Sequence, residues 1–363
     1  MSLFGPGIGE CIVVHVGGGD WIIVDSCIDR SSRGPIALKY LRSLGVNVES
    51  QVKLVVATHW HDDHIQGLAE ILDAAKSARF VNSAAYALKD LMRLVVLGNA
   101  MPPTSSATRE YDAIVKVLKE RRDASERREA VGPIPALANK KILAQTVRTA
   151  ACSLEVEIYA LSPSDGVFNI AHHIAQHELS DAFSAIQHGR RPVVQGPNQL
   201  SVVLWLKVGA LDVLLGADLE HVAGATEGWR AIVHSRERPS GKASCFKVPH
   251  HGSRNADCPE SWTELLSAKP IAMLTPHAPS GLPKDADIAR LCARTPFVYL
   301  TGDPARYGRP RRDNAVEKTL REVTLSRRAV SGRMGHVRLR ADAIDSGQEP
   351  LVELGNGAQQ LCA

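Results

Sequence analysis

Residues 58–64 constrain this chain more than any other part of its sequence. They read Thr-His-Trp-His-Asp-Asp-His and directly follow an apolar run at residues 54–57, which is typical of a buried strand. Imidazoles and carboxylates that gather at the end of a buried strand need mutual neutralisation, and a bound cation provides it. Nitrogen and oxygen donors at this density suit zinc, manganese or iron, whereas solvated loop histidines are the alternative interpretation. The candidate ligands are His59, His61, Asp63 and His64.

The segments around this stretch predict an α/β fold. Strand-like runs at residues 10–16 and 21–24 are joined by a glycine-rich turn, and residues 35–44 have apolar positions at helical spacing. A strand is predicted at residues 52–57, and helical spacing resumes at Ile65. This alternation places the candidate ligands at the carboxyl end of a strand, where α/β folds usually hold their sites.

Two aspartates also stand at predicted strand ends. Asp25 follows the strand at residues 21–24, where it can cap a turn or hold a ligand imidazole in position. Asp218 follows a strand predicted at residues 210–215, which a tight turn joins to another at residues 199–208. Its carboxylate can bridge two cations or cap the next helix. Beside a histidine-rich stretch, we favour the metal-related role for both.

A pair of histidines follows a further strand end. Residues 245–249 are largely apolar and lead into His250, His251, Gly252 and Ser253. Adjacent side chains leave a strand in opposite directions, so both histidines reach one site only if the chain bends, which Gly252 permits. We expect one histidine to bind metal and the other to face substrate, with His250 as the marginal choice for the ligand.

Length and composition fit a single enzyme domain spanning residues 1–363. The chain is 44% hydrophobic, which can supply a substantial core, and its net charge of +4 neither demands nor excludes a polyanionic partner. The seven cysteines are odd in number, scattered and lack a C-x-x-C pair, which predicts a reduced, cytoplasmic protein. We see no export signal and no apolar run of about 20 residues, so we predict no membrane association.

Two segments depart from the regular pattern. Residues 84–197 are predicted to form a helical insertion, either a solvated surface or a lid that contacts substrate or a protein partner. Residues 303–363 form a basic C-terminal segment, with arginines concentrated at residues 306–312 around Tyr307. This charge could guide a nucleic-acid backbone, with the tyrosine available for stacking, or it could be a solvated surface.

Taken together, these features resemble the metallo-β-lactamase superfamily. The pattern H-x-H-x-D-H at residues 59–64 is similar to the signature of that superfamily, and Asp25, Asp218 and the pair His250–His251 occur in the expected order. The resemblance implies an αββα sandwich, with two mixed β-sheets flanked by helices and the helical insertion described above.

A narrower resemblance concerns the second half of the chain. Residues 198–204, 214–218 and 248–253 look like the nuclease domain of ComEC-type DNA-uptake proteins. Many superfamily members have a histidine near the position of Asn198, whereas the ComEC-type relatives share the asparagine. An asparagine carbonyl is a harder and weaker ligand than an imidazole, which favours manganese over zinc at that position, although its contact with metal stays open.

The resemblance and the donor set together imply a hydrolase with two divalent cations, zinc or manganese. One cation would be held by His59, His61 and Asn198, and the other by Asp63, His64 and a strand-end histidine. Asp218 would lie between the two, and Asp25 would support a ligand imidazole.

The implied reaction is cleavage of phosphodiester bonds by metal-bound hydroxide, most naturally in DNA or RNA. Asp63 would orient the hydroxide, and His251 or Ser253 would contact a phosphate oxygen. His277, which follows another predicted strand, could protonate a leaving group or simply line the pocket. Two alternatives stay open: hydrolysis of a small carboxylic ester, thioester or lactone, and a partner-gated effector or binding module without constitutive activity.

Overall fold

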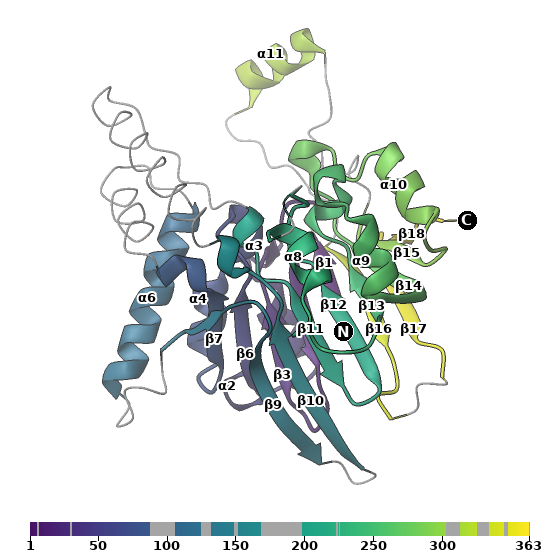
Figure 1. Cartoon of the computed structure of the whole chain (residues 1–363). Helices are drawn as coiled ribbons and strands as arrows, with labels where there is room; N and C mark the ends of the chain where they lie inside the picture. The colour runs from purple at the N-terminus through teal and green to yellow at the C-terminus, as the bar shows by residue number, and fades with distance from the viewer. Residues whose placement is uncertain are drawn as a thin grey trace.

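The structure is a computed structural model, and it describes most of the chain. The described residues are 1–5, 7–29, 31–87, 106–124, 132–148, 152–167, 198–222, 224, 226–302, 313–324, 334–344 and 348–362. Within them the chain forms two large mixed β-sheets that pack face to face, with helices on both outer faces (Figure 1). The αββα sandwich predicted from the sequence is therefore confirmed.

Sheet 1 has the strand order β17-β16-β1-β2-β3-β6-β7-β8. From β17 to β3 its neighbours are antiparallel, and from β3 to β8 they are parallel. Val24 lies opposite Val56 in the β3–β6 pair, so these two strands end side by side. The strands are β1 (Ser2–Gly5), β2 (Cys11–His15), β3 (Trp21–Val24), β6 (Val52–Ala57), β7 (Arg79–Ser83), β8 (Ile134–Ala136), β16 (Gly335–Arg340) and β17 (Leu351–Gly355).

Sheet 2 has the order β18-β15-β14-β13-β12-β11-β10-β9 and a similar design. Strands β9 to β12 are antiparallel neighbours, and β12 to β15 are parallel. The strands are β9 (Lys140–Arg148), β10 (Ser153–Ala160), β11 (Leu204–Val208), β12 (Leu211–Leu215), β13 (Ala243–Lys247), β14 (Leu266–Leu274), β15 (Val298–Leu300) and β18 (Gln359–Gln360). A separate two-stranded sheet joins β4 (Ile28–Asp29) to β5 (Gly34–Pro35).

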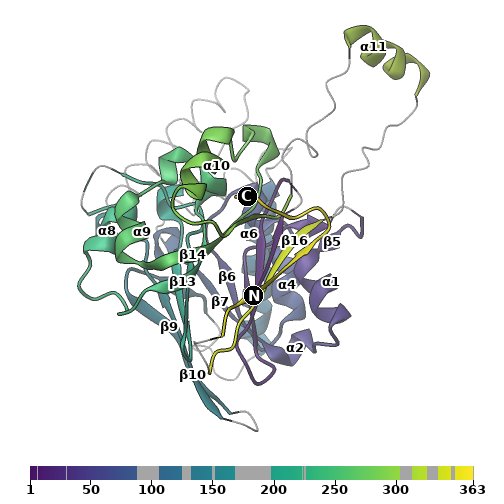
Figure 2. The same ribbon diagram turned by 90° about the vertical axis from the view of Figure 1, so that its right-hand side faces the viewer.

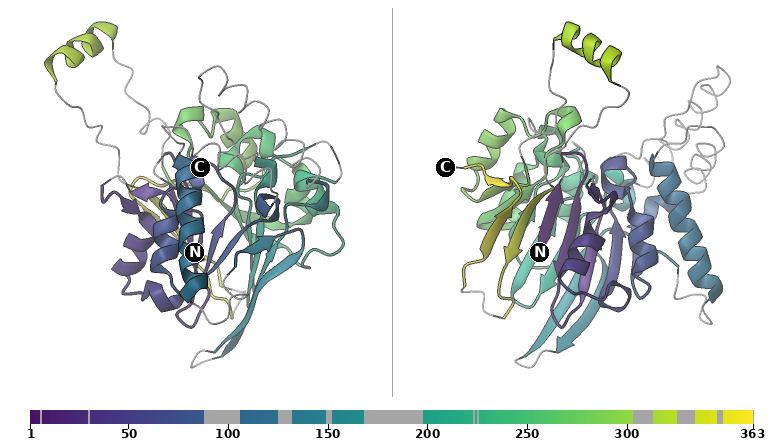
Figure 3. Two further views of the ribbon diagram at one scale, coloured as in Figure 1. Left: turned by 90° about the vertical axis from the view of Figure 1, so that its left-hand side faces the viewer. Right: turned by 180° about the vertical axis from the view of Figure 1, so that it is seen from behind.

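Helices cover the outer face of each sheet. Figure 2 shows α1, α4 and α6 on the side of sheet 1, and α8, α9 and α10 on the side of sheet 2. Helix α11 stands apart from both sheets in every view (Figure 3). Among the described helices, none has the length and apolar character needed to cross a bilayer. The helices are α1 (Ile36–Ser43), α2 (Val48–Gln51), α3 (Asp62–Ile65), α4 (Leu68–Ala74), α6 (Ser106–Ala124), α8 (Gly228–His234), α9 (Pro259–Glu264), α10 (Asp285–Cys292) and α11 (Asn314–Val323).

The hydrophobic core lies in three layers because strand side chains alternate between the two faces of a sheet. In β6, Leu54 and Val56 point into the layer between the sheets, whereas Val55 points towards the helices of sheet 1. Phe246 of β13 and Trp229 of α8 belong to the third layer, beneath the helices of sheet 2. Strands that are buried on both faces explain the nearly continuous apolar runs before the candidate ligands.

The predicted helical insertion is only partly helical. Within residues 84–197, α6 is the expected charged helix, but β8 extends sheet 1, and β9 and β10 extend sheet 2. Polar side chains on the exposed face of β9 and β10 alternate with buried ones such as Ile142 and Val156, and this obscured the strand pattern in the sequence. Residues 88–105 and 168–197 lie outside the described part of the chain, as do residues 303–312 of the basic segment.

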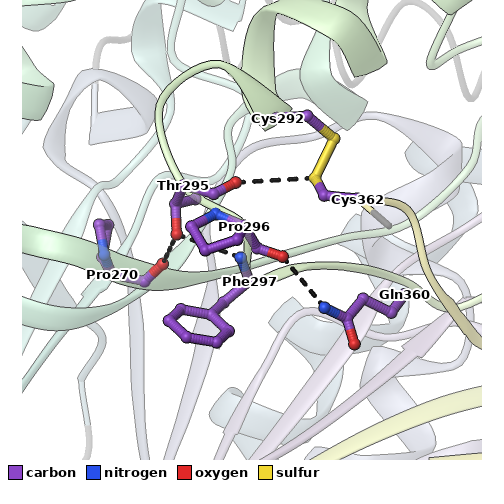
Figure 4. The surroundings of a disulfide bond; sticks show 7 residues. All are labelled: Pro270, Cys292, Thr295, Pro296, Phe297, Gln360 and Cys362. Carbon is purple, nitrogen blue, oxygen red and sulfur yellow. Dashed lines mark hydrogen bonds between the residues drawn. A yellow bond between two sulfur atoms is a disulfide. The ribbon is translucent and has the colours of Figure 1, made fainter.

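A disulfide joins Cys292 at the end of α10 to Cys362, which follows β18 (Figure 4). The expectation that every cysteine is reduced is therefore wrong for this pair, whose Cα atoms lie 5.5 Å apart despite a separation of 70 residues. Tertiary packing brings them together, and a spacing pattern cannot report that. Gln360 supports the arrangement by donating from Nε2 to Pro296 O at 3.1 Å. Cys11, Cys27, Cys152, Cys245 and Cys258 carry thiols.

Candidate metal centre

The site lies where parallel strands of both sheets reach their carboxyl ends. From sheet 1, β6 leads into Thr58 and then into the ligand stretch, which continues as α3. From sheet 2, β12 leads into Asp218, and β13 leads into the short 3-10 turn His250–Gly252. The two halves of the candidate site are therefore supplied by different sheets, and they meet only because the sheets pack face to face.

The centre of the site is a buried cluster of Asp63, His64, Asp218 and His251. One candidate ligand atom from each lies within 4.8 Å of the others. His64 Nε2 is 3.4 Å from Asp218 Oδ2 and 3.7 Å from Asp63 Oδ2. His251 Nε2 is 3.3 Å from Asp63 Oδ2 and 3.7 Å from Asp218 Oδ2. Two imidazole nitrogens and two carboxylate oxygens thus face a common centre.

Asp25 lies against the imidazole of His64, on the side away from the cluster. Its Oδ2 accepts from His64 Nδ1 at 2.8 Å and from Thr58 Oγ1 at 2.7 Å, while its Oδ1 accepts from Thr58 N at 2.8 Å. A proton on His64 Nδ1 leaves the lone pair of Nε2 pointing into the cluster. This is the supporting position that the sequence predicts for Asp25.

Thr58 orients His59 in the same way. Because the Thr58 hydroxyl donates to Asp25, it accepts from His59 Nδ1 at 3.0 Å. His59 Nε2 then faces Asp218 Oδ2 at 3.9 Å and His61 Nδ1 at 3.2 Å. His59 is wholly buried, whereas His61 is partly exposed. Both predicted histidines therefore border the cluster on the Asp218 side.

Asn198 and His250 form a polar group beside the cluster rather than within it. Asn198 Nδ2 donates to Glu220 Oε1 at 3.0 Å and lies 3.4 Å from His250 Nε2. His250 Nδ1 is 3.6 Å from Glu220 Oε1. Of the two adjacent histidines, the structure thus places His251 in the cluster and His250, the marginal choice from the sequence, beside it. His250 still contributes electrostatically to the lowered pKa of His61, so it stays near the His59/His61 half.

The backbone around these residues is unusual. Asp25, Ala217, His250 and His251 all have positive φ, between 45° and 57°. For residues that carry a Cβ this region is disfavoured, and such conformations gather at functional sites. The two successive left-handed residues turn His251 back towards the other sheet, which the sequence alone could not reveal.

The electrostatics divide the histidines into two groups. Burial together with the neighbouring imidazoles lowers the pKa of His59, and burial lowers the pKa of His61 despite nearby carboxylates. Burial has the same tendency at His64 and His251, but the surrounding carboxylates outweigh it and raise both pKa values. His59 and His61 are therefore neutral imidazoles that can bind a cation directly. His64 and His251 are protonated in the metal-free protein, and a cation would displace a proton from each.

The two carboxylates of the cluster stay ionised despite their burial. Burial disfavours the anions, but the imidazoles of His64 and His251 hold the pKa of Asp63 well below its usual value. The same two imidazoles, with Lys247, do so at Asp218. Two ionised carboxylates that face each other in a buried site are a strong attractor for a divalent cation.

Unsatisfied polar atoms show that the residues fit a metal. Among the described residues, buried side-chain atoms without a hydrogen-bond partner include His64 Nε2, Asp218 Oδ1, Asn198 Oδ1 and His250 Nδ1. Of these atoms, His64 Nε2 faces the carboxylates of the cluster, Asp218 Oδ1 faces Lys247, and the other two lie beside the cluster. Buried polar atoms are normally paired, so the unpaired Nε2 at the centre fits a bound cation. Nitrogen and carboxylate donors suit zinc and manganese.

Sequence reasoning missed three residues behind the cluster. Lys247 is wholly buried, with its Nζ 2.6 Å from Glu10 Oε1 and 3.7 Å from Asp218 Oδ1. Thr275 Oγ1 donates to Glu10 Oε2 at 2.8 Å and lies 2.9 Å from His251 Nδ1. The signal for Lys247 was a single lysine inside the apolar run at residues 245–249. Glu10 and Thr275 carried no such signal.

The remaining predicted residues lie at the rim or outside it. His277 stacks on His251 with ring centroids 5.1 Å apart, and its Nε2 is 3.8 Å from Asp63 Oδ2. Ser253 donates its backbone N–H to His250 O and lines a small cavity with Trp262, beneath the helices of sheet 2. His277 is thus brought to the cluster, whereas Ser253 lines this cavity.

The sandwich of two mixed sheets, with a cluster of histidines and aspartates at their strand ends, defines an α/β protein with a candidate metal centre. Residues 4–89 match the family model of the Metallo-beta-lactamase superfamily, and this segment contains the ligand stretch. This part of the chain is therefore similar to that superfamily, and the two-sheet sandwich agrees with the fold expected from the sequence.

Solved structures give only a distant likeness. A metallo-beta-lactamase from Cronobacter sakazakii is 12% identical, with a TM-score of 0.31, and the match covers 67% of this chain and 74% of that one. A B3 metallo-beta-lactamase with an active-site glutamic acid is 12% identical, with a TM-score of 0.31 and coverage of 88% and 83%. A subclass B3 metallo-beta-lactamase from a soil metagenome library is 12% identical, with a TM-score of 0.30, and the match covers 89% of this chain and 82% of that one. No curated protein matches the chain significantly.

Proposed function

We propose that this chain is a metal-dependent phosphodiesterase, and specifically a nuclease acting on DNA or RNA. The observation that carries the proposal is the buried cluster of Asp63, His64, Asp218 and His251, whose donor atoms converge within 4.8 Å. The resemblance of residues 198–204 and 248–253 to the ComEC-type nuclease domain supports the phosphodiester assignment. The solved relatives named above are too distant to indicate a substrate.

Two divalent cations, zinc or manganese, would occupy the site. Asp63, His64 and His251 would hold one of them, and Asp218 Oδ2 lies where it can reach both. His59 and His61 would hold the other, and Asn198 Oδ1 is a nearby oxygen without a hydrogen-bond partner that could join them as a ligand. The oxygen donor in place of an imidazole favours manganese at this second position.

When bound, such a pair of cations lowers the pKa of a water molecule and stabilises charge on a phosphoryl group. The protein side chains would then orient the reactants. Asp63 is the cluster residue with the most exposed side chain, 15%, so its carboxylate can accept a hydrogen bond from the attacking water. Burial and the neighbouring His251 lower the pKa of His277, which leaves a neutral imidazole at the rim to contact the leaving group.

The sequence suggested that His251 or Ser253 contacts a phosphate oxygen, and the proposed site gives each of them a different role. In the proposed site His251 is a ligand, because its Nε2 faces both carboxylates. Ser253 is the weaker candidate for phosphate contact, since it lines a cavity beside Trp262. His250 is better placed to face substrate, since it is partly exposed and lies beside the cluster.

Recognition of a polymer rests on sequence predictions, and the arginine-rich residues 306–312 lie outside the described part of the chain. The basic segment at residues 303–363 would attract a phosphate backbone, and Lys318 of α11 is an exposed part of it. A protein partner bound through the insertion at residues 84–197, and a cytoplasmic location, likewise stay predictions.

The proposal can be tested with the purified chain. We would incubate it with single- and double-stranded DNA, RNA and bis-p-nitrophenyl phosphate in the presence of manganese, zinc or magnesium. The double variant Asp63→Ala/His64→Ala should lose cleavage, whereas His234→Ala, on the exposed end of α8, should retain it. The nuclease assignment fails if no metal supports cleavage of any phosphodiester, or if the double variant cleaves as well as the wild type.

Two further arms separate the alternatives. Hydrolysis of p-nitrophenyl acetate, a lactone or a β-lactam, unaffected by added DNA, would indicate a carboxylic ester or amide hydrolase with the same centre. Stoichiometric metal binding without hydrolysis of any substrate would favour the partner-gated effector. Metal analysis of the protein as purified distinguishes both from a chain that binds no cation.

A further inference from the structure

A wholly buried lysine lies directly behind the metal cluster. Lys247 is the last residue of β13, and none of its side chain is exposed. Its ammonium donates to Ala217 O at 2.9 Å and pairs with Glu10 at 2.6 Å. A buried charge is costly unless it is paired and hydrogen-bonded, and an apolar side chain would fill the same space without that cost. Packing alone therefore does not explain why a lysine stands at position 247.

One consequence of this lysine concerns the two oxygens of Asp218. Lys247 Nζ lies 3.7 Å from Asp218 Oδ1, whereas His64, His251 and His59 all face Asp218 Oδ2. The ammonium attracts one oxygen of the carboxylate away from the cluster. The other oxygen is then the one presented to a cation.

A second consequence passes through Glu10 and Thr275 to His251. The carboxylate of Glu10, held by Lys247 on one oxygen, accepts the Thr275 hydroxyl proton on the other at 2.8 Å. With its proton committed to Glu10, Thr275 Oγ1 can only accept from His251 Nδ1, and Thr275 O, 3.2 Å from the same nitrogen, is an acceptor as well. The proton of the neutral His251 ring therefore resides on Nδ1, and Nε2 offers its lone pair to the cluster.

We propose that Glu10, Thr275 and Lys247 are positioning residues that prepare Asp218 and His251 to bind a cation. They form one chain of contacts behind the cluster, Asp218–Lys247–Glu10–Thr275–His251, in which ion pairs join the first three residues and hydrogen bonds join the last three. Glu10 comes from the beginning of sheet 1, whereas the other four come from sheet 2, so the chain also fixes the two sheets at the site. The inference rests on the proposed metal centre but not on the identity of the substrate.

The test compares metal affinity with fold stability. Lys247→Met keeps a side chain of similar length, but it leaves Glu10 as an unpaired buried charge and should destabilise the fold. The double variant Lys247→Met/Glu10→Gln removes both charges, so we expect it to recover the thermal stability of the metal-free wild type. Its affinity for Zn²⁺ or Mn²⁺, measured by competition with a chromophoric chelator, should stay about 10- to 100-fold weaker.

Two controls separate positioning from general effects. Lys207→Met/Asp212→Asn removes both charges of an ion pair between β11 and β12, whose Nζ and Oδ1 lie 2.9 Å apart. Like the double variant it leaves the net charge unchanged, and it should leave metal affinity unchanged. Thr275→Val should weaken metal binding several-fold, whereas Thr275→Ser, which keeps the hydroxyl, should restore it. Thr275 variants also test the inference if the double variant does not fold.

The outcomes distinguish this inference from the proposed function. If the wild type binds neither Zn²⁺ nor Mn²⁺, the metal centre is wrong and the inference falls with it. If the wild type binds metal and the double variant binds it equally well, the buried pair is only structural and the inference is overturned. Equal affinities of Thr275→Val and the wild type would remove the part that concerns His251.

Discussion

Substitution of Asp25 by asparagine should reverse the proton arrangement of His64. The asparagine oxygen can replace Oδ1, which accepts from Thr58 N, but its amide group then stands where Oδ2 accepts from Thr58 Oγ1 and His64 Nδ1. An amide donor beside Nδ1 favours the tautomer with its proton on Nε2. His64 then presents a donor, instead of a lone pair, to the cluster.

The expected loss in metal affinity is about 10- to 100-fold, or roughly 1.4 to 2.8 kcal/mol, which is the usual effect of disturbing a residue that orients a metal ligand. Chelator competition near neutral pH would measure it, with circular dichroism to verify the fold. A sharper expectation concerns how two variants at this position rank in stability and in metal affinity. Asp25→Ala should cost more stability than Asp25→Asn but less metal affinity, because alanine removes the acceptor without supplying a competing donor.

The matched control is Asp29→Asn, which makes the same change on the neighbouring turn. Asp29 accepts from Ser31 and pairs with Lys39 at 2.6 Å, and these contacts lie outside the cluster. Its variant should bind metal like the wild type. Wild-type affinity in Asp25→Asn would refute the proton arrangement assigned to His64, and so would a greater loss in Asp25→Ala than in Asp25→Asn.

Three further predictions concern stability, measured by urea or thermal unfolding of the metal-free protein. Burial and a nearby arginine lower the pKa of His336 from 6.5 to about 4. The imidazole therefore binds a proton more readily in the unfolded chain than in the folded one. The free energy of unfolding should fall by at most about 3 kcal/mol as the pH drops from 6.5 to 4. His336→Phe should abolish that part of the loss while keeping the stacking on Phe4; an unchanged pH profile would contradict it. Arg121 of α6 donates to backbone carbonyls at and beyond the C-terminal end of α4, so Arg121→Ala should cost about 2 to 3 kcal/mol, and a neutral effect would show that α6 is not anchored there. Cys292→Ser should cost up to about 4 kcal/mol for opening the 70-residue loop to Cys362, and reduction of the wild type should match it.

The sequence predicted the location of the site because each apolar run that forms a strand is followed directly by polar candidate ligands. The run at residues 52–57 became β6 with the predicted bounds, and the ligands followed it directly. Asp218 likewise follows β12 with only two residues between. Parallel strands of one sheet end at the same edge, so the pattern predicted the edge of each sheet that carries ligands. The meeting of β6 with β12 depends on the packing of the two sheets against each other.

The choice between His250 and His251 could not be predicted in the same way. It depends on two successive residues with φ of 46° and 52°, a conformation that side chains with a Cβ rarely adopt. The sequence indicated a bend through Gly252, but it did not indicate which ring the bend would turn inward. Strain of this kind is maintained by the surrounding tertiary structure, so local pattern reasoning misses it.

Glu10 and Lys247 were missed for a related reason. Each is a charged residue in or beside a strand, and a charged residue in a strand ordinarily indicates an exposed face. Their burial is tolerated only because they meet each other across the two sheets, at 2.6 Å. A contact between such distant parts of the chain leaves no periodic signal in the sequence.

The division of the cluster between two sheets links metal binding to the packing of the sandwich. Asp63 and His64 lie in α3, which follows β6 of sheet 1, and Asp218 and His251 follow β12 and β13 of sheet 2. A cation bound by all four therefore stabilises the contact between the two sheets. Without a cation the two carboxylates would repel each other across this junction. The raised pKa values of His64 and His251 show how the metal-free protein avoids that repulsion, since their protons neutralise the carboxylates from both sides. A cation that displaces those protons takes over the same role, so metal affinity should increase with pH while the metal-free protein loses stability above the usual histidine range.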